Sequence, residues 1–128
     1  MVKEIVLSDN APRPIGPYCQ GVLVGDFLFT SGQIGLDPDT GELVSPLVSE
    51  QTRKALDNLA QVLKARRLSL RDVVKTTVYL SDMKDFPELN RVYGEFFREQ
   101  PPARTTVGVS SLPMNARVEI EAIALARA

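Results

Sequence analysis

The sequence has 128 residues, 44% of them hydrophobic, and its 15 basic and 16 acidic side chains leave a net charge of −1. This length and composition are typical of one globular domain, so we expect residues 1–128 to form a single domain. A nearly neutral chain has no overall field to hold a phosphate backbone or an anionic membrane, so neither is an expected partner. No apolar run approaches the roughly 18 residues that would cross a bilayer.

The residue types that are missing narrow the chemistry. With no histidine and a single cysteine, Cys19, the chain cannot build a Ser-His-Asp or Cys-His site or a typical zinc site, so no metal is expected. Neither a GxxxxGK[ST] loop nor a GxGxxG segment is present, which argues against nucleotide cofactors held in those ways. One cysteine forms no internal disulfide, and the N-terminus lacks a secretory pattern, so we expect a reducing, cytoplasmic location.

The N-terminal part of the chain predicts three strands. Residues 3–7 (KEIVL) predict a short first strand. Residues 11–17 contain three prolines, which exclude regular ladder pairing and predict a loop. Residues 18–24 and 27–31 are β-prone runs separated by Gly25-Asp26. This spacing predicts a hairpin with a two-residue turn.

The middle of the chain predicts a turn, two helices and a strand between them. Residues 37–41 have the Asp, Pro and Gly content of a turn. Residues 49–66 carry apolar side chains every three or four positions, the period of an amphipathic helix. Residues 73–80 are a β-branched run that favours a strand. Apolar spacing predicts a second helix over residues 85–99, with Pro87 in its first turn.

The C-terminal part predicts two more strands. Pro101 and Pro102 end the second helix, and residues 103–109 continue extended. Residues 117–126 alternate, with Val, Ile and Ala on one face and mainly charged side chains on the other. The expected order is β-β-β-α-β-α-β-β, an α+β fold in which two helices cover one face of a mixed sheet. Because the second face of the sheet is also apolar, we expect it to be buried against another subunit.

Two charged positions are candidates for chemistry. Arg104 begins a strand behind two prolines, and a planar guanidinium there suits bidentate capture of a small carboxylate. A surface salt bridge is the commoner role for arginine. Glu119 and Glu121 share one strand face, where a carboxylate could position or deprotonate a water molecule. The alternative for both is a solvated strand face beside Arg117.

Two further positions lie where a loop meets a strand. Tyr18 follows Gly16-Pro17, so its ring could either wall a pocket or belong to the core. Gly32 and Gly35 follow a strand, where bare backbone can approach a ligand closely. A β-bulge or a turn is the simpler explanation of these glycines.

Six segments in this order make the chain resemble the RidA (YjgF) family. They are residues 15–21 (IGPYCQG), 30–34 (TSGQI), 74–80 (VKTTVYL), 90–97 (NRVYGEFF), 102–105 (PART) and 118–124 (VEIEAIA). The resemblance spans nearly the whole chain. It implies a chorismate-mutase-like homotrimer without a cofactor. Each of its three clefts would join Arg104 and Glu119 of one subunit to groups such as Tyr18 of the next.

The resemblance also implies roles for single residues. Arg104 corresponds to the carboxylate anchor, Glu119 to the residue that handles the attacking water, and Tyr18 to a wall of the cleft. Gly32 and the backbone of Thr106 correspond to groups that contact the substrate, and Asn90 to a residue near the site. Many relatives carry Cys in place of Thr106. Because the expected contact is through the backbone, we expect that the reaction is retained.

The activity implied by the resemblance is hydrolysis of reactive enamines and imines, 2-aminoacrylate and the 2-imino acids of pyruvate and 2-ketobutyrate, to 2-keto acids and ammonia. This would be a form of metabolite damage control. The same family includes translation inhibitors described as ribonucleases and keto-acid-binding sensors. The charge balance argues against the ribonuclease, because only residues 64–67 (KARR) come near a basic cluster. A sensor would use the same arginine and cleft, so it stays open.

Overall fold

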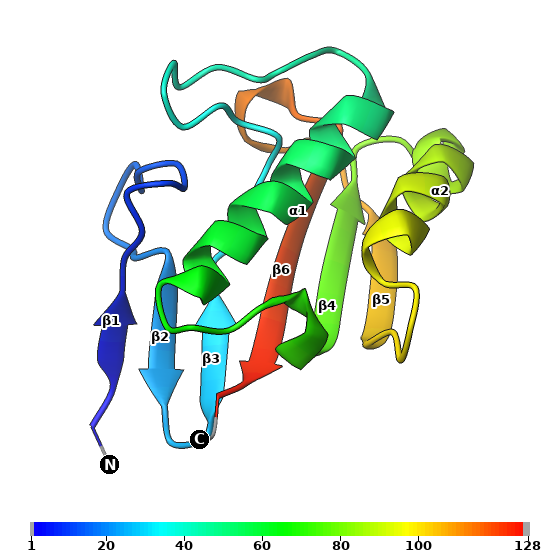
Figure 1. Cartoon of the computed structure of the whole chain (residues 1–128). Coiled ribbons are helices and arrows are strands. Elements are labelled where there is room, and N and C mark those ends of the chain that lie inside the picture. Colours follow the sequence, from blue (N-terminus) through cyan, green and yellow to red (C-terminus); the bar gives the residue numbers. More distant parts are fainter. Residues whose placement is uncertain (1, 127–128) are drawn as a thin grey trace.

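The computed structural model describes residues 2–126 and has the predicted order of elements (Figure 1). Short 3-10 turns precede β4, α2 and β6. The strands and helices are β1 (Glu4–Val6), β2 (Gly21–Val24), β3 (Phe27–Thr30), α1 (Val48–Lys64), β4 (Val73–Leu80), α2 (Phe86–Phe96), β5 (Ala103–Gly108) and β6 (Val118–Leu125).

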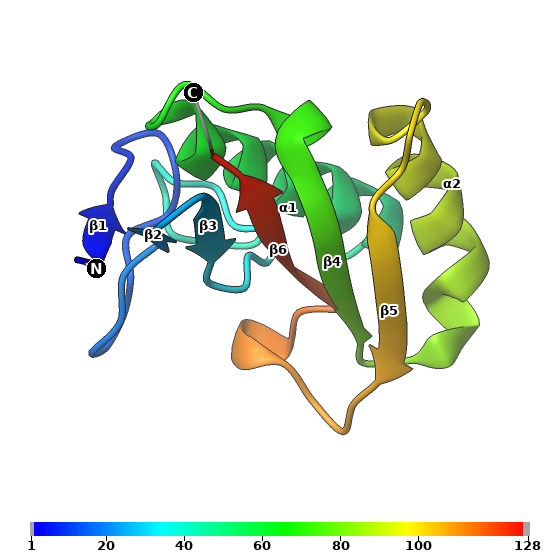
Figure 2. The same ribbon diagram turned by 90° about the horizontal axis from the view of Figure 1, so that it is seen from below.

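The strands form one six-stranded sheet in the order β1-β2-β3-β6-β4-β5. β4 and β5 are parallel and the other pairs are antiparallel, so the sheet is mixed as predicted. Both helices lie on the same face of this sheet (Figures 1 and 2). β6, the last strand of the chain, lies in the middle of the sheet, and β5 lies at one edge. None of the helices in residues 2–126 is long and apolar enough to span a membrane.

Two element boundaries and two turns test the local predictions. Strand β2 begins at Gly21 and not at Tyr18, because Tyr18 to Gln20 belong to a folded loop. Helix α2 ends at Phe96, because Phe97 already has a non-helical backbone (φ −121°, ψ 64°). The Gly25-Asp26 hairpin turn is confirmed, with a positive φ of 57° at Gly25. The turn over residues 37–41 is confirmed by the Asp37 Oδ1 that accepts the Asp39 N–H at 2.8 Å.

The core lies between the helices and the sheet. The predicted inner face of β6 is confirmed, since its four small and branched side chains are at most 3% exposed. Helix α1 buries its apolar stripe against them, with three leucines that are fully buried. The residues concerned are Val118, Ile120, Ala122 and Ala124 of β6 and Leu56, Leu59 and Leu63 of α1.

The opposite face of the sheet carries an apolar patch. Phe27 and Phe29 of β3 are each 42% exposed there, opposite Leu125 and Ile123 of β6. Val22 is the partner of Phe29 in β2 and lies on the same face. No helix of residues 2–126 covers this face (Figure 2). The prediction of a second apolar face is therefore confirmed, and we call it the open face.

Candidate functional site

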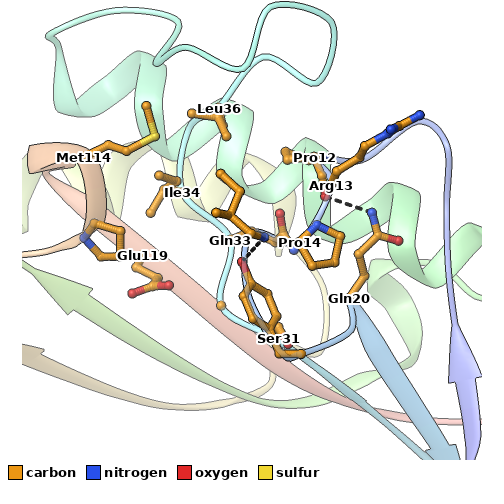
Figure 3. Close-up of a pocket in the computed structure, with 14 residues that line it drawn as sticks. Pro12, Arg13, Pro14, Gln20, Ser31, Gln33, Ile34, Leu36, Met114 and Glu119 are labelled. Carbon is orange, nitrogen blue, oxygen red and sulfur yellow. Dashed lines mark hydrogen bonds between the residues drawn. The ribbon is translucent and has the colours of Figure 1, made fainter.

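A cavity of about 550 Å³ lies between the loop before β2, the segment after β3 and the start of β6 (Figure 3). It brings together three of the predicted site residues, Tyr18, Gly32 and Glu119. The rest of its lining is mostly apolar or proline. These residues are Pro12, Arg13, Pro14, Ile15, Gln20, Ser31, Gln33, Ile34, Leu36, Pro113 and Met114.

Glu119 is the ionisable group of this cavity whose environment is most unusual. It is half-buried on β6, and burial raises the pKa of its carboxyl above the ordinary value. The negative charge of Glu121, two residues along the same face, raises this pKa further. No cation of residues 2–126 forms an ion pair with Glu119. A carboxyl with a raised pKa in a cleft is a better proton acceptor than an ordinary carboxylate, which suits it to acid/base chemistry.

Glu121 has a partner that Glu119 lacks. Tyr79 of β4 lies opposite Glu119 in the strand register, and its hydroxyl donates a hydrogen bond of 3.1 Å to Glu121 Oε1. Burial, that hydrogen bond and the two nearby carboxylates raise the pKa of Tyr79. Tyr79 therefore stays protonated as the donor to Glu121, and Glu119, not Glu121, lines the cavity.

Gly32 allows Glu119 to lie directly against the backbone. A Cβ atom at this position would lie 2.5 Å from Glu119 Oε2, which no side chain tolerates without displacement. The chain bulges here, because Phe29 pairs with Ile123 and Gln33 with Ile120, so four steps on one strand match three on the other. The bulge that was the simpler explanation of Gly32 is thus present, and it also forms part of the cavity wall.

Tyr18 lies at the mouth of the cavity and is 54% exposed, so it is not a core residue. Its hydroxyl accepts the Ile15 N–H at 3.2 Å, and its own N–H donates to the Gly16 carbonyl at 2.9 Å. Gly16 has a φ of 120°, which favours glycine over any other residue. The ring is therefore held in a compact turn beside the cavity.

Gln20 holds the loop that carries Tyr18, and the sequence reasoning did not identify it. Its buried side-chain amide donates to the carbonyls of Ser8, Ala11 and Pro12 at 3.0, 3.3 and 2.9 Å, and its Oε1 accepts the Ser8 N–H at 2.6 Å. Because its prolines keep this loop out of the sheet, the loop carbonyls have no strand partners. They need another hydrogen-bond donor. A lone glutamine after a proline-rich loop was the signal.

Two buried side chains of α1 hold the other wall, and these were also missed. Asn58 donates to the carbonyls of Ile34 and Leu36 at 3.1 and 2.9 Å. Gln51 donates to Ser45 and accepts the Arg117 N–H at 2.8 Å. Polar residues on the apolar stripe of a predicted helix were the available signal, since buried amides are almost always bonded.

Arg104 lies outside this cavity, on the helix-covered face of the sheet. It pairs with Thr76 across β5 and β4, and its guanidinium lies over two aromatic rings of α2. The Arg104 Cζ atom is 4.7 Å from the centroid of Tyr93 and 5.6 Å from that of Phe86. No carboxylate of residues 2–126 forms an ion pair with it, so the surface salt bridge is not its role within this chain.

Thr106 and Asn90 lie near Arg104 and not near Glu119. Thr106 is two residues further along β5, so it faces the same side, and its buried hydroxyl has no partner in residues 2–126. Asn90 lies on α2, four residues after Phe86 and three before Tyr93, which places it on the same helix face. Arg104, Thr106 and Asn90 thus form a second group at the β5 edge.

The two groups lie on opposite faces of the sheet within one chain. The inner face of β6 is formed by Val118 and Ile120, so Glu119 between them points to the other side. Arg104 points toward α2. Our sequence interpretation placed Arg104 and Glu119 together in one chain, with Tyr18 supplied by a neighbour. That grouping is wrong, because Glu119 and Tyr18 share a cavity and Arg104 is the residue apart.

Comparisons with known proteins agree on one family. The family model described as Endoribonuclease L-PSP matches residues 8–126. A RutC family protein of Pyrococcus horikoshii is 52% identical over 123 residues, which are 96% of this chain and 98% of that protein. The human 2-iminobutanoate/2-iminopropanoate deaminase is 43% identical, covering 98% of this chain and 91% of the human one. The crystal structure of the E. coli YjgF gene product is 44% identical with a TM-score of 0.92, covering 97% and 99%.

Proposed function

We propose, from the premise that this chain belongs to the endoribonuclease L-PSP family of YjgF and RidA proteins, that it hydrolyses 2-imino acids to 2-keto acids and ammonia. The substrates are the reactive imines 2-iminopropanoate and 2-iminobutanoate, in equilibrium with enamines such as 2-aminoacrylate. The mammalian relatives named 2-iminobutanoate/2-iminopropanoate deaminase, 43 to 45% identical, support this substrate class. The role is removal of reactive intermediates in the cytoplasm.

The observation that carries the proposal is a pair of uncompensated charges on opposite faces of one sheet. Glu119 faces a cavity whose lining includes Arg13, yet it forms no ion pair within residues 2–126, and Arg104 lies over aromatic rings of α2 without a carboxylate partner in the same residues. Charged groups are seldom buried without a partner, and a 2-imino acid in water carries both a carboxylate and a protonatable nitrogen. Such a substrate complements both groups when a neighbouring copy brings them together.

We further propose that the neighbour is a second copy in a homotrimer. The open face needs cover, since Phe27 and Phe29 are 42% exposed beside Ile123 and Leu125. Cyclic closure is the usual arrangement of soluble homo-oligomers. Each cleft then takes Arg104, Thr106 and Asn90 from one subunit and Tyr18, Gly32 and Glu119 from the next.

In the proposed mechanism, Arg104 binds the substrate carboxylate through two parallel N–H donors. A water molecule beside Glu119 loses a proton to the Glu119 carboxylate as the water oxygen attacks the carbon of the protonated imine and gives the carbinolamine. Protonated Glu119 then returns its proton to the carbinolamine nitrogen, the C–N bond breaks and ammonia leaves, and the hydroxyl proton passes back to the Glu119 carboxylate as the C=O bond of the keto acid forms. Such imines already hydrolyse in water. Orientation together with one acid/base group, worth about 10²–10⁴-fold, therefore suffices.

Two other activities are tested beside this one. A keto-acid sensor would use the same arginine without turnover. A ribonuclease would need a basic surface, yet Arg66 of the predicted basic segment pairs with Glu4 at 3.3 Å. The deciding experiment generates 2-aminoacrylate with a serine dehydratase and follows keto-acid release with and without the protein. Faster release than in buffer supports the deaminase. Keto-acid binding without acceleration indicates the sensor, and cleavage of RNA without acceleration indicates the ribonuclease.

A further inference from the structure

We infer that Phe86 and Tyr93 are positioning residues for Arg104: their rings hold the guanidinium flat and leave its N–H edge free for the carboxylate of the substrate. The inference rests on the proposed function, because it assumes that Arg104 is the carboxylate anchor. It adds two residues of α2 to the machinery of the cleft. Neither was identified as a functional residue from the sequence.

The geometry of the contact leaves the donors of Arg104 available. All five N–H bonds of a guanidinium lie in its plane, so a carboxylate or carbonyl partner would occupy them at the edge. An aromatic ring can stack on the face of the guanidinium instead, which leaves these edge donors free. The Arg104 Cζ atom lies 4.7 Å from the Tyr93 centroid and 5.6 Å from the Phe86 centroid, both within the range of this interaction.

Tyr93 is itself held in place by two contacts. Its hydroxyl shares a hydrogen bond of 2.7 Å with the Thr76 hydroxyl, and its ring lies 4.6 Å from the ring of Phe97, centroid to centroid. The side chain is only 6% exposed. Thr76 is also the strand partner of Arg104. Thr76 of β4 therefore fixes both the Tyr93 ring and the backbone of Arg104.

Such support matters because β5 is an edge strand. It pairs only with β4, so no strand on its outer side restrains the long Arg104 side chain. A free arginine loses rotamer entropy when it binds a ligand, and prior ordering removes that cost. The rings thus raise affinity for the carboxylate without neutralising the charge that attracts it.

The experiment measures binding of 2-oxobutanoate, the stable keto-acid product, by isothermal titration with the full chain. Phe86→Leu and Tyr93→Leu remove a ring and are each expected to raise the Kd about five- to tenfold. Tyr93→Phe keeps the ring and is expected to recover most of the affinity. Phe96→Leu, a ring on the same helix with no contact to Arg104, is the matched control and leaves the Kd unchanged.

Two further readouts separate positioning from loss of structure. In the Leu variants KM should rise while kcat changes little, because the carboxylate is held equally in the ground and transition states. The Arg104 Nε–H proton should lose its ring-current shift in the NMR spectrum of Tyr93→Leu. If Tyr93→Leu fails to fold, Phe86→Leu alone decides.

The outcomes distinguish this inference from the proposed function. If Arg104→Ala binds 2-oxobutanoate as tightly as the unmodified chain, Arg104 is not the anchor and the proposed site fails. If Arg104→Ala loses binding while Phe86→Leu and a folded Tyr93→Leu keep it, only the role of the rings is overturned. Equal weakening by Phe96→Leu would also overturn it, because the effect would then be general to α2.

Discussion

Arg104 and Glu119 point to opposite faces of the same sheet, Arg104 toward the aromatic rings of α2 and Glu119 into the cavity beside Gly32. Strand β4 lies between the strands that carry them. A substrate small enough to be a 2-imino acid therefore meets both groups only where two copies of the chain adjoin. The separation of these two residues links the proposed activity to the assembly.

Replacement of Arg104 tests the anchor. Arg104→Ala should abolish acceleration of imine hydrolysis while the chain stays folded, because the side chain makes no ion pair within residues 2–126 and only its contacts with the Phe86 and Tyr93 rings are lost. Arg104→Lys should rescue little, since a point charge cannot grip a carboxylate with two parallel donors. Near-normal rates from a folded Arg104→Ala protein would remove Arg104 from the site.

Subunit mixing tests whether the cleft is shared. Arg104→Ala chains and Glu119→Gln chains should each be inactive as pure trimers. Every mixed ring restores one intact interface out of three, so an equal mixture should regain about a quarter of the normal sites after full exchange. A mixture of Arg104→Ala and Tyr18→Ala chains should regain activity to the same extent. A mixture of Glu119→Gln and Tyr18→Ala chains should stay inactive, because both residues belong to the same side of the cleft.

Two results would contradict the shared cleft. One is a molecular mass near 14.1 kDa, that of a single chain, in place of about three times this value. It would be measured by sedimentation on a fully active sample of the unmodified protein. The other is a mixture of Arg104→Ala and Glu119→Gln chains that stays inactive although exchange is demonstrated by mass spectrometry.

Gly32→Ala tests the close approach of Glu119. The added Cβ would lie 2.5 Å from Glu119 Oε2, so the carboxylate must move, and displacement by about 1 Å can cost about 10²-fold in rate. The free energy of unfolding should change little, because the displaced atoms end a flexible side chain. Gly94→Ala is the control: no atom lies within 4 Å of its new Cβ, so activity should persist and stability should rise by about 0.5–1 kcal/mol. Full activity in Gly32→Ala would show that the position of Glu119 is not critical.

The pH profile tests the charge beside Glu119. Glu121 raises the pKa of the Glu119 carboxyl, and the ionised form is the one that accepts a proton from water. Activity should therefore rise with pH through the pKa of Glu119. Glu121→Gln removes the neighbouring negative charge, which lowers that pKa and moves the acidic limb of kcat/KM to lower pH. The exposed Glu42→Gln should leave the limb in place, and an unmoved limb in Glu121→Gln would exclude Glu119 as the titrating group.

Much of the fold was predictable from local patterns. The alternation along residues 118–125 identified the buried face of β6, and the three- to four-residue spacing identified both helices. These patterns work because each side chain of a strand or helix takes its direction from the local backbone. The six segments that resemble the family contain the residues proposed for the site apart from Thr106, and the structure places them at the cavity and at the β5 edge.

Other features depended on long-range packing. The order of strands along the chain does not reveal that β6 lies between β3 and β4 in the sheet. The structural role of Gln20 depends on three loop carbonyls that accept hydrogen bonds from its side chain only in the folded protein. Alternation along β6 places the side chains of Glu119 and Ile120 on opposite faces of the sheet. It does not say whether Glu119 shares a face with Arg104, which lies on another strand. That relation is set by the register of both strands with β4 and by the face that the helices cover, and only the folded sheet decides these together.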